Sequence, residues 1–186
     1  MTILAIDFGG TQVKSALVSE EFALEKSLPT QSSPQTLNQT LDVIDYLVTS
    51  VKVALTGIAI SVPGTVDTDE GVIYHGGLLR FFHGFRIKDI LEAKYHLPVT
   101  ALNDGKAAAL GELAMGHLQG VTNGAALVLG SGLGGGLIIN GKLFQGSHFQ
   151  AAELTFLLPV QMEKVNPSQM YHSTLQSSLK IRLLYG

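Results

Sequence analysis

A repeated local pattern constrains the fold of this 186-residue chain more than any other feature. In each copy a short apolar run leads into a glycine-rich turn, and a second β-like run follows. The first copy starts near residue 3 and the second near residue 125. Glycines between two such runs are typical of a β-hairpin. Two α/β lobes that each begin in this way predict a cleft between them, with a turn suited to phosphate on each side.

Strands and helices alternate between and after these hairpins. Apolar residues at helical spacing indicate helices, and continuous or alternating apolar runs indicate strands. We expect a first lobe over residues 1–117 and the start of a second lobe over 118–186. The Asn140-Gly141 pair predicts a type I′ turn. The predicted strands cover 2–7, 11–18, 22–26, 53–62, 71–74, 99–102, 125–129, 137–139 and 142–144, and the predicted helices cover 34–51, 87–95, 106–117 and 168–184.

Composition and charge exclude several classes of protein. Hydrophobic residues make up 46% of the chain and charged residues 15%, which excludes a disordered chain. The net charge is −3, so there is no basic field for nucleic acid. The chain has no cysteine, which excludes disulfides and thiolate metal sites. The uncharged segment 118–141 is long enough to cross a bilayer, but its glycines favour two β runs and no membrane partner. The N-terminus lacks a basic, apolar leader, so we expect a cytoplasmic protein.

The first motif is Asp7-Phe8-Gly9-Gly10-Thr11, with Lys14 shortly after it. Paired glycines let backbone N–H groups approach an anion, and the threonine adds a hydroxyl donor. A carboxylate at a strand end can hold Mg²⁺ through water, because Mg²⁺ keeps most of its water ligands. A tight hairpin with an acidic turn residue explains the same residues equally well.

The second motif is the segment Gly130–Gly136, which holds five glycines in seven positions between two apolar runs. Each glycine weakens a regular element by roughly 0.5–1 kcal/mol, and close approach to phosphate would explain that cost. No Gly-Lys-Ser/Thr sequence follows, so the segment is not a Walker A loop. A flexible loop without a ligand is the alternative.

The third motif is Asn103-Asp104 at a junction from strand to helix. Ligand sites in α/β proteins lie at the carboxyl ends of strands, where a carboxylate can accept the proton of an attacking hydroxyl. Taken alone, these two residues are better explained as a simple helix N-cap, worth about 1 kcal/mol, than as a catalytic site. Ser61-Val62-Pro63-Gly64 and Glu153 are weaker signals, since a rigid turn and a surface residue would explain them.

In this order, the motifs resemble the ROK family of sugar kinases, which belongs to the actin-like ATPase superfamily. The resemblance runs from Ile3 to about Glu153 and includes Leu102-Asn103-Asp104 and Asn140-Gly141-Lys142. It implies an α/β fold of the ribonuclease H-like, actin-like ATPase type, with the first lobe complete and the second partial. It also implies ATP-dependent phosphorylation of a hexose or amino-sugar hydroxyl.

The resemblance assigns roles to individual residues. Asp104 would be the general base, and Asp7 would face Mg²⁺ through water. The residues that would hold the sugar are Asn103, Glu153, His148 and Gly64. The residues that would hold ATP are Asp7, Gly9, Gly10, Thr11 and Lys14 in the first lobe and Gly130, Ser131, Gly132, Gly134 and Gly135 in the second.

Two departures from the family pattern change what we expect. Phe156 stands where many members have a zinc-binding histidine, so we expect no zinc. The segment Phe149–Ala152 replaces positions that are often glycine, and we expect these side chains to narrow the sugar pocket or to block a backbone conformation.

The third departure is length, since family members are longer. We therefore expect a fragment, a frameshifted product or a reduced relative that loses most of its catalysis, because phosphoryl transfer needs a closed, dry cleft. A partial second lobe would expose apolar surface, which favours a homodimer or aggregation. The alternatives are a catalytically inactive sugar-binding protein and an inactive truncated fragment.

Overall fold

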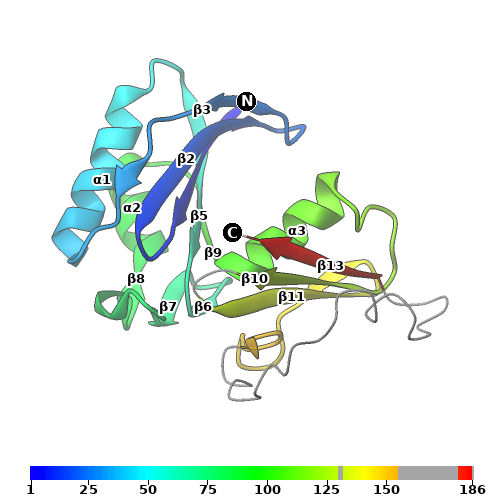
Figure 1. Cartoon of the computed structure of the whole chain (residues 1–186). Helices are drawn as coiled ribbons and strands as arrows, with labels where there is room; N and C mark the ends of the chain where they lie inside the picture. Colours follow the sequence, from blue (N-terminus) through cyan, green and yellow to red (C-terminus); the bar gives the residue numbers. More distant parts are fainter. Residues whose placement is uncertain (130–131, 155–179, 186) are drawn as a thin grey trace. The chain divides into compact units, whose positions relative to one another are not determined.

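A computed structural model of the chain describes residues 1–129, 132–154 and 180–185 (Figure 1). Contacts between residues divide the chain into two compact units, Met1–Ala107 and Ala108–Gly186. The division falls inside helix α3, which spans Asp104–Met115. Each unit is described by itself below.

The first unit is built on a mixed six-stranded sheet. Its strands run in the order β3-β2-β1-β5-β9, and β4 pairs with β2. Strand β1 is antiparallel to β2 but parallel to β5, which is parallel to β9, so the carboxyl ends of these last three strands share one edge of the sheet. The bounds are β1 Thr2–Phe8, β2 Gln12–Ser19, β3 Leu24–Ser27, β4 Gln31–Ser32, β5 Leu55–Val62 and β9 Val99–Asn103.

Two helices, α1 (Leu37–Ser50) and α2 (Ile87–Tyr95), lie side by side against the sheet (Figure 1). Thr36 begins α1, because its side-chain oxygen accepts a hydrogen bond from the Gln39 N–H. Asp45 on α1 joins the two helices through its bonds with Lys94 and Tyr95. The buried core between helices and sheet comes mainly from alternating strand positions and one helix face, including Leu4, Ile6, Phe8, Ile44, Leu47, Ile58, Ile60 and Leu91.

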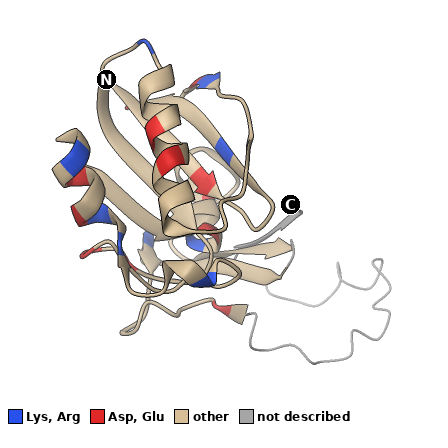
Figure 2. Cartoon of the chain, turned by 90° about the vertical axis from the view of Figure 1, so that its left-hand side faces the viewer, with Lys and Arg blue, Asp and Glu red and all other residues tan. Residues whose placement is uncertain are grey.

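Charged residues are sparse and mixed in sign over this unit. Figure 2 shows basic and acidic positions interspersed on the face in view, with most of the ribbon uncharged. Helix α2 carries both signs, whereas α1 carries only acidic residues. This distribution agrees with the low charged content of the sequence and offers no single-sign field in that view.

A small antiparallel sheet completes the first unit. It consists of β6 (Thr65–Asp67), β7 (Val72–His75) and β8 (Phe85–Arg86), in that order. The short 3₁₀ helix η1 (Arg80–Phe82) connects β7 to β8 and places Phe82 in the core against Phe8. This sheet begins directly after Gly64, so it fixes the turn that follows β5.

The second unit contains a four-stranded sheet in the order β12-β11-β10-β13. Its strands are β10 (Gly124–Leu129), β11 (Leu133–Ile139), β12 (Lys142–Phe144) and β13 (Lys180–Tyr185). Asn140 and Gly141 join β11 to β12 with φ values of 53° and 72°. A type I′ turn requires positive φ at both positions, so the predicted hairpin is confirmed.

The helix predicted over 168–184 is wrong over its last part. Residues 180–185 form strand β13, which pairs in parallel with the whole of β10. Residues 168–179 lie outside the described residues. Polar and apolar residues also alternate in Lys180-Ile181-Arg182-Leu183, as they do in a strand. Where a run fits both a helix and a strand, pairing with a neighbouring strand decides which of the two forms.

Most other predicted elements are found with their ends shifted by one to three residues. The sequence did not predict β4, β6, β8 or η1, which have two or three residues each. Among the helices of the described residues, none is both long enough and apolar enough to cross a membrane.

Candidate functional site

The carboxyl ends of β1, β5 and β9 bring polar side chains from three separate motifs together. Asp7 on β1 is in register with Ser61 on β5, and the Ser61 hydroxyl donates a hydrogen bond of 2.5 Å to Asp7 Oδ1. Asn103 ends β9 one position further along and Asp104 begins α3. The first-lobe motifs thus meet at one sheet edge, where α/β proteins bind ligands.

The side chain of Asn103 caps α3. Its Oδ1 accepts a hydrogen bond of 3.0 Å from the Lys106 N–H, three residues along. Its Nδ2 donates to the Gly64 carbonyl at 2.9 Å and to Asp104 Oδ1 at 3.0 Å. The residue is only 3% exposed, so its amide holds the β5 turn, the cap and the neighbouring carboxylate together. The N-cap interpretation is therefore correct for Asn103, while its contact with a sugar stays a prediction.

Asp104 is left with a carboxylate that is only partly engaged by the protein. Its Oδ1 accepts hydrogen bonds from the Gly105 N–H at 2.8 Å and from Asn103. Solvent reaches the residue, but the protein packed around the carboxylate raises its pKa, and the negative charge of Asp7 raises it further. The Gly105 hydrogen bond and the buried Lys106 act in the opposite direction. A raised pKa makes Asp104 a better proton acceptor than an ordinary aspartate.

Gly64 is required by close packing as well as by its backbone conformation. Its φ is +94°, and a Cβ at this position would lie 1.9 Å from the His75 carbonyl oxygen and 2.6 Å from the Gly77 nitrogen. The end of β7 and the loop after it therefore pack directly against the turn after β5. Any side chain here would displace the carbonyl that Asn103 binds.

The turn between β1 and β2 is held by a residue that sequence reasoning missed. Ser33 donates its hydroxyl to the Gly9 carbonyl at 2.8 Å and its N–H to the Thr11 carbonyl at 3.1 Å. A Cβ on Gly10 would lie 3.2 Å from Leu78 Cδ1, so a loop also approaches this turn closely. Ser33 lies in a segment that reads only as a polar loop, and in the structure it directly follows β4, which pairs with β2.

The fit of a cation to this edge follows from the chemistry of Asp7. Its carboxylate is exposed, and Lys14 lies opposite it in the β1–β2 register. No group of three or more His, Asp or Glu side chains among the described residues could hold a metal ion directly. One hard oxygen donor suits Mg²⁺ that keeps its waters and shares phosphate oxygens with a nucleotide. The donor set therefore fits water-mediated Mg²⁺, and the expected absence of zinc stays a prediction.

The glycine segment of the second unit differs from the prediction. Gly134 and Gly135 lie within β11, paired with Val128 and Leu127, so the prediction that they belong to the turn is wrong. A Cβ on Gly135 would lie 2.4 Å from the carbonyl oxygen of Ala126, which is a packing reason for glycine. Gly132 is exposed just before β11, and Gly130 and Ser131 lie outside the described residues.

The segment Phe149–Ala152 adopts a conformation that its sequence does not favour. Phe149 and Ala152 have φ values of 55° and 64°, in the left-handed region. Residues with a Cβ therefore adopt the left-handed conformation here, while the expected narrowing of the sugar pocket or loss of a needed backbone conformation stays a prediction. The conformation forms with a cost of about 1–2 kcal/mol for each residue that has a Cβ. His148, whose Nδ1 is 3.0 Å from Ser147 Oγ, and Glu153 flank this segment.

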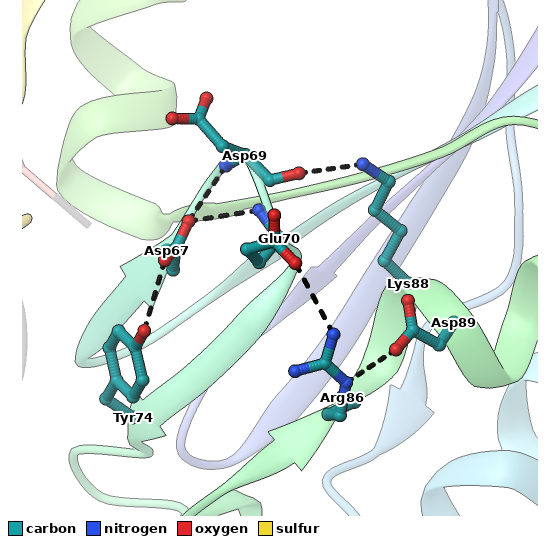
Figure 3. Close-up of polar contacts among 7 residues, drawn as sticks. All are labelled: Asp67, Asp69, Glu70, Tyr74, Arg86, Lys88 and Asp89. Atoms are coloured by element: carbon teal, nitrogen blue, oxygen red, sulfur yellow. Dashed lines mark hydrogen bonds and ion pairs between the residues drawn. The ribbon is translucent and has the colours of Figure 1, made fainter.

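A second polar cluster, at the turn between β6 and β7, is structural (Figure 3). Buried Asp67 accepts hydrogen bonds from the N–H groups of Asp69 and Glu70 through Oδ1 and from the Tyr74 hydroxyl through Oδ2. The bond to Asp67 raises the pKa of Tyr74. Arg86 extends the cluster by ion pairs to Glu70 and Asp89. These contacts hold the small sheet and, through it, the residues packed on Gly64.

The fold is mixed α/β, and the solved structures that it matches are ROK proteins with the actin-like ATPase fold. The chain belongs to the ROK family, whose profile matches residues 3–166. The predicted family and fold class are thereby confirmed.

Several of the similar proteins are sugar kinases by name. A beta-glucoside kinase from Listeria monocytogenes is 33% identical over 194 residues, which covers 100% of this chain and 63% of that protein. The solved structure of a ROK family glucokinase from Streptomyces griseus with glucose and AMPPNP has a TM-score of 0.76 and 31% identity, over 83% of this chain and 49% of that one. A ROK family protein from Streptococcus pneumoniae with sucrose has a TM-score of 0.74 and 34% identity, over 87% and 54%. The chain thus spans between about half and 63% of these relatives.

Proposed function

We propose that this chain carries the catalytic base and first phosphate-binding turn of an ATP-dependent kinase for a hexose, an amino sugar or a β-glucoside. The observation that carries the proposal is the position of Asp104. It lies at the edge where three parallel strands end, with its pKa raised and with the cap of α3 supplied by its neighbour. The relatives, which include a beta-glucoside kinase and a glucokinase with glucose and AMPPNP, support the reaction class.

In this proposal Asp104 accepts the proton of the sugar hydroxyl as that oxygen attacks the γ-phosphorus of ATP. A new O–P bond forms, the bond to the β-phosphate oxygen breaks, and ADP leaves. The hydrogen bonds from Asn103 and from the Gly105 N–H both end on Oδ1, so we assign the proton to Oδ2. Asn103 fixes the carboxylate and, with Gly64, forms the wall that faces the sugar. For Glu153 and His148, the sugar contacts that the family resemblance implies are also part of this proposal.

The phosphates would lie against the turn after β1. The N–H groups of Gly10 and Thr11, with the hydroxyl of Thr11 and the ammonium of Lys14, suit the β- and γ-phosphates. Gly132 and the neighbouring Gly130 and Ser131 would supply the corresponding turn of the second unit. Mg²⁺ near Asp7, when bound, would neutralise charge that develops on the phosphate oxygens.

The direct test is ADP release by the 186-residue chain with glucose, mannose, fructose, N-acetylmannosamine, N-acetylglucosamine and a β-glucoside. Asp104→Asn should lower transfer by about 10²- to 10⁴-fold, the usual contribution of a general base. Calorimetry should show that this variant still binds the sugar. Asp42→Asn, an exposed aspartate on α1, is the matched control and should leave both unchanged.

Two results would contradict the proposal. If no sugar in the panel is bound or phosphorylated by the wild-type chain, the chain does not have this function. If Asp104→Asn retains transfer while the substrate is bound, the base is another group. Sugar binding without nucleotide binding would instead identify a catalytically inactive sugar binder.

Three further expectations remain proposals. The first lobe is proposed to extend over 1–117, with the second beginning at 118. We also propose a homodimer, testable by sedimentation. A cytoplasmic location is proposed because the chain has no cysteine for disulfides and its nucleotide substrate would be ATP.

A further inference from the structure

We propose that Ser61 is a positioning residue that acts through Asp7. Its hydroxyl fixes the carboxylate in the orientation in which it faces the cation of a metal–nucleotide complex. This inference rests on the proposed function, in which Asp7 faces Mg²⁺, and it assigns a role to a residue that does not itself touch the cation.

The geometry of the contact is that of a charge-assisted hydrogen bond. Asp7 and Ser61 face each other in the parallel register of β1 and β5, each at the carboxyl end of its strand. The distance from Ser61 Oγ to Asp7 Oδ1 is 2.5 Å. Hydroxyl–carboxylate bonds of about 2.5–2.7 Å are shorter and roughly twice as strong as neutral ones.

The bond from Ser61 distinguishes the two carboxylate oxygens of Asp7. Oδ1 accepts the hydrogen bond from Ser61, so we assign Oδ2 to the water ligands of the cation. Asp7 is exposed, and an exposed aspartate that lacks such a bond distributes over several rotamers. Groups that hold a metal-facing carboxylate in place typically change metal affinity by 10- to 100-fold when they are removed.

Ser61 and Lys14 occupy opposite sides of Asp7 and act differently. The β-sheet register places Lys14, Asp7 and Ser61 in one row across β2, β1 and β5. Lys14 contributes a positive charge, which the proposed function assigns to the phosphates. Ser61 contributes direction without charge, so its removal should weaken metal binding rather than strengthen it.

The test measures binding of Mn²⁺, an EPR-visible substitute for Mg²⁺, to the full chain in the presence of AMPPNP. Ser61→Ala should weaken Mn²⁺ binding by about tenfold, whereas Ser61→Thr, which keeps the hydroxyl, should stay within about twofold. Thr56→Ala is the matched control. Thr56 also donates its hydroxyl from β5 to β1, at 3.2 Å to the Thr2 carbonyl, but at the opposite end of the strands.

Asp7→Asn separates failure of this inference from failure of the proposed function. If Asp7→Asn and Ser61→Ala both weaken Mn²⁺ binding while Thr56→Ala and Ser61→Thr do not, Ser61 has the proposed role. If Asp7→Asn weakens binding and Ser61→Ala does not, the inference on Ser61 is overturned alone. If the wild-type chain takes up no Mn²⁺–AMPPNP, or Asp7→Asn leaves uptake unchanged, the cation site at Asp7 is wrong and the role of Ser61 falls with it. Circular dichroism melting of each variant shows whether a loss of Mn²⁺ binding is caused by unfolding. If Ser61→Ala is unfolded, a Ser61→Cys variant that is folded but binds Mn²⁺ weakly would still support the role.

Discussion

Replacing Asn103 with alanine should destabilise the chain strongly, because this side chain makes hydrogen bonds to the Lys106 N–H and to the Gly64 carbonyl. The substitution removes the acceptor for the Lys106 N–H, and the loss of such an N-cap costs about 1 kcal/mol. It also leaves the partly buried Gly64 carbonyl without the amide that now donates to it, at a cost of about 1–3 kcal/mol. The sum is a loss of about 2–4 kcal/mol in the free energy of unfolding.

Urea unfolding followed by circular dichroism measures this loss. Asn103→Asp separates its parts, since the carboxylate still accepts from Lys106 but cannot donate to Gly64 and adds a negative charge beside Asp104. Asn38→Ala is the control, because Asn38 is an exposed residue of α1, where alanine favours the helix. An Asn103→Ala variant within about 0.5 kcal/mol of the wild type would refute the role given to this side chain, since that is the usual range of neutral surface substitutions.

Two glycines, one alanine in the left-handed backbone region and the carboxylate of Asp104 give the other predictions. Gly64→Ala should lower the free energy of unfolding by at least about 3 kcal/mol, because the new Cβ would lie 1.9 Å from the His75 carbonyl oxygen. Gly111→Ala in α3 should raise it by about 1 kcal/mol, because the new Cβ would meet nothing within 4 Å. Thermal melting compares the two variants. Ala152→Gly should stabilise the chain by up to about 1 kcal/mol, since φ is 64° there, and an unchanged or lower melting temperature would contradict the left-handed conformation. The raised pKa of Asp104 means that its carboxylate binds a proton more tightly in the folded chain than in the unfolded chain. Above the folded pKa, the ionised carboxylate therefore lowers the free energy of unfolding. This cost disappears as the pH falls below 3.8, the ordinary pKa of an aspartate. Asp104→Asn should therefore melt at or above the wild-type temperature at pH 7, with the difference vanishing near pH 3, and transfer by the wild type should fall as pH drops through the raised pKa.

The sequence predicted the order of elements well where local signals agreed. Apolar spacing located α1, α2 and α3, and the Asn140-Gly141 pair located a hairpin whose φ values are those expected. The short strands β6 and β8 escaped prediction because two or three residues carry no periodicity, and they exist only through their pairing with β7.

The errors in the second unit have a common physical cause. Strand pairing, which is a long-range property, decided both. Residues 180–185 pair with β10 in spite of leucines at helical spacing, and Gly134 and Gly135 pair with the same strand although their composition is that of a loop. A local window of sequence contains no information on which partner strand is available.

The candidate site was predictable as a set of motifs but not as a set of contacts. Asp7, Gly64, Asn103 and Asp104 were named from their positions at strand ends, and the structure places all four in the first unit. The link from Ser61 to Asp7 and the support of the Gly9 turn by Ser33 depend on residues 54 and 24 positions apart. Nothing in their local sequence distinguishes these serines from surface serines.

The order of Asn103 and Asp104 explains how one junction can both begin a helix and present a base. A helix N-cap must accept a hydrogen bond from an N–H of the first turn, and such a bond stabilises the ionised form of a carboxylate and lowers its basicity. Here the neutral amide of Asn103 accepts the bond from Lys106, so the charge of Asp104 is not needed as the cap. Asp104 begins the helix one position later, where burial of its carboxylate raises its pKa and the negative charge of Asp7 raises it further. Exchanging the two residue types would keep the cap but place the carboxylate at the buried position 103 and the amide at position 104. Helix capping alone would be satisfied by either order, so the order found here is the one that the proposed role of Asp104 as a base requires.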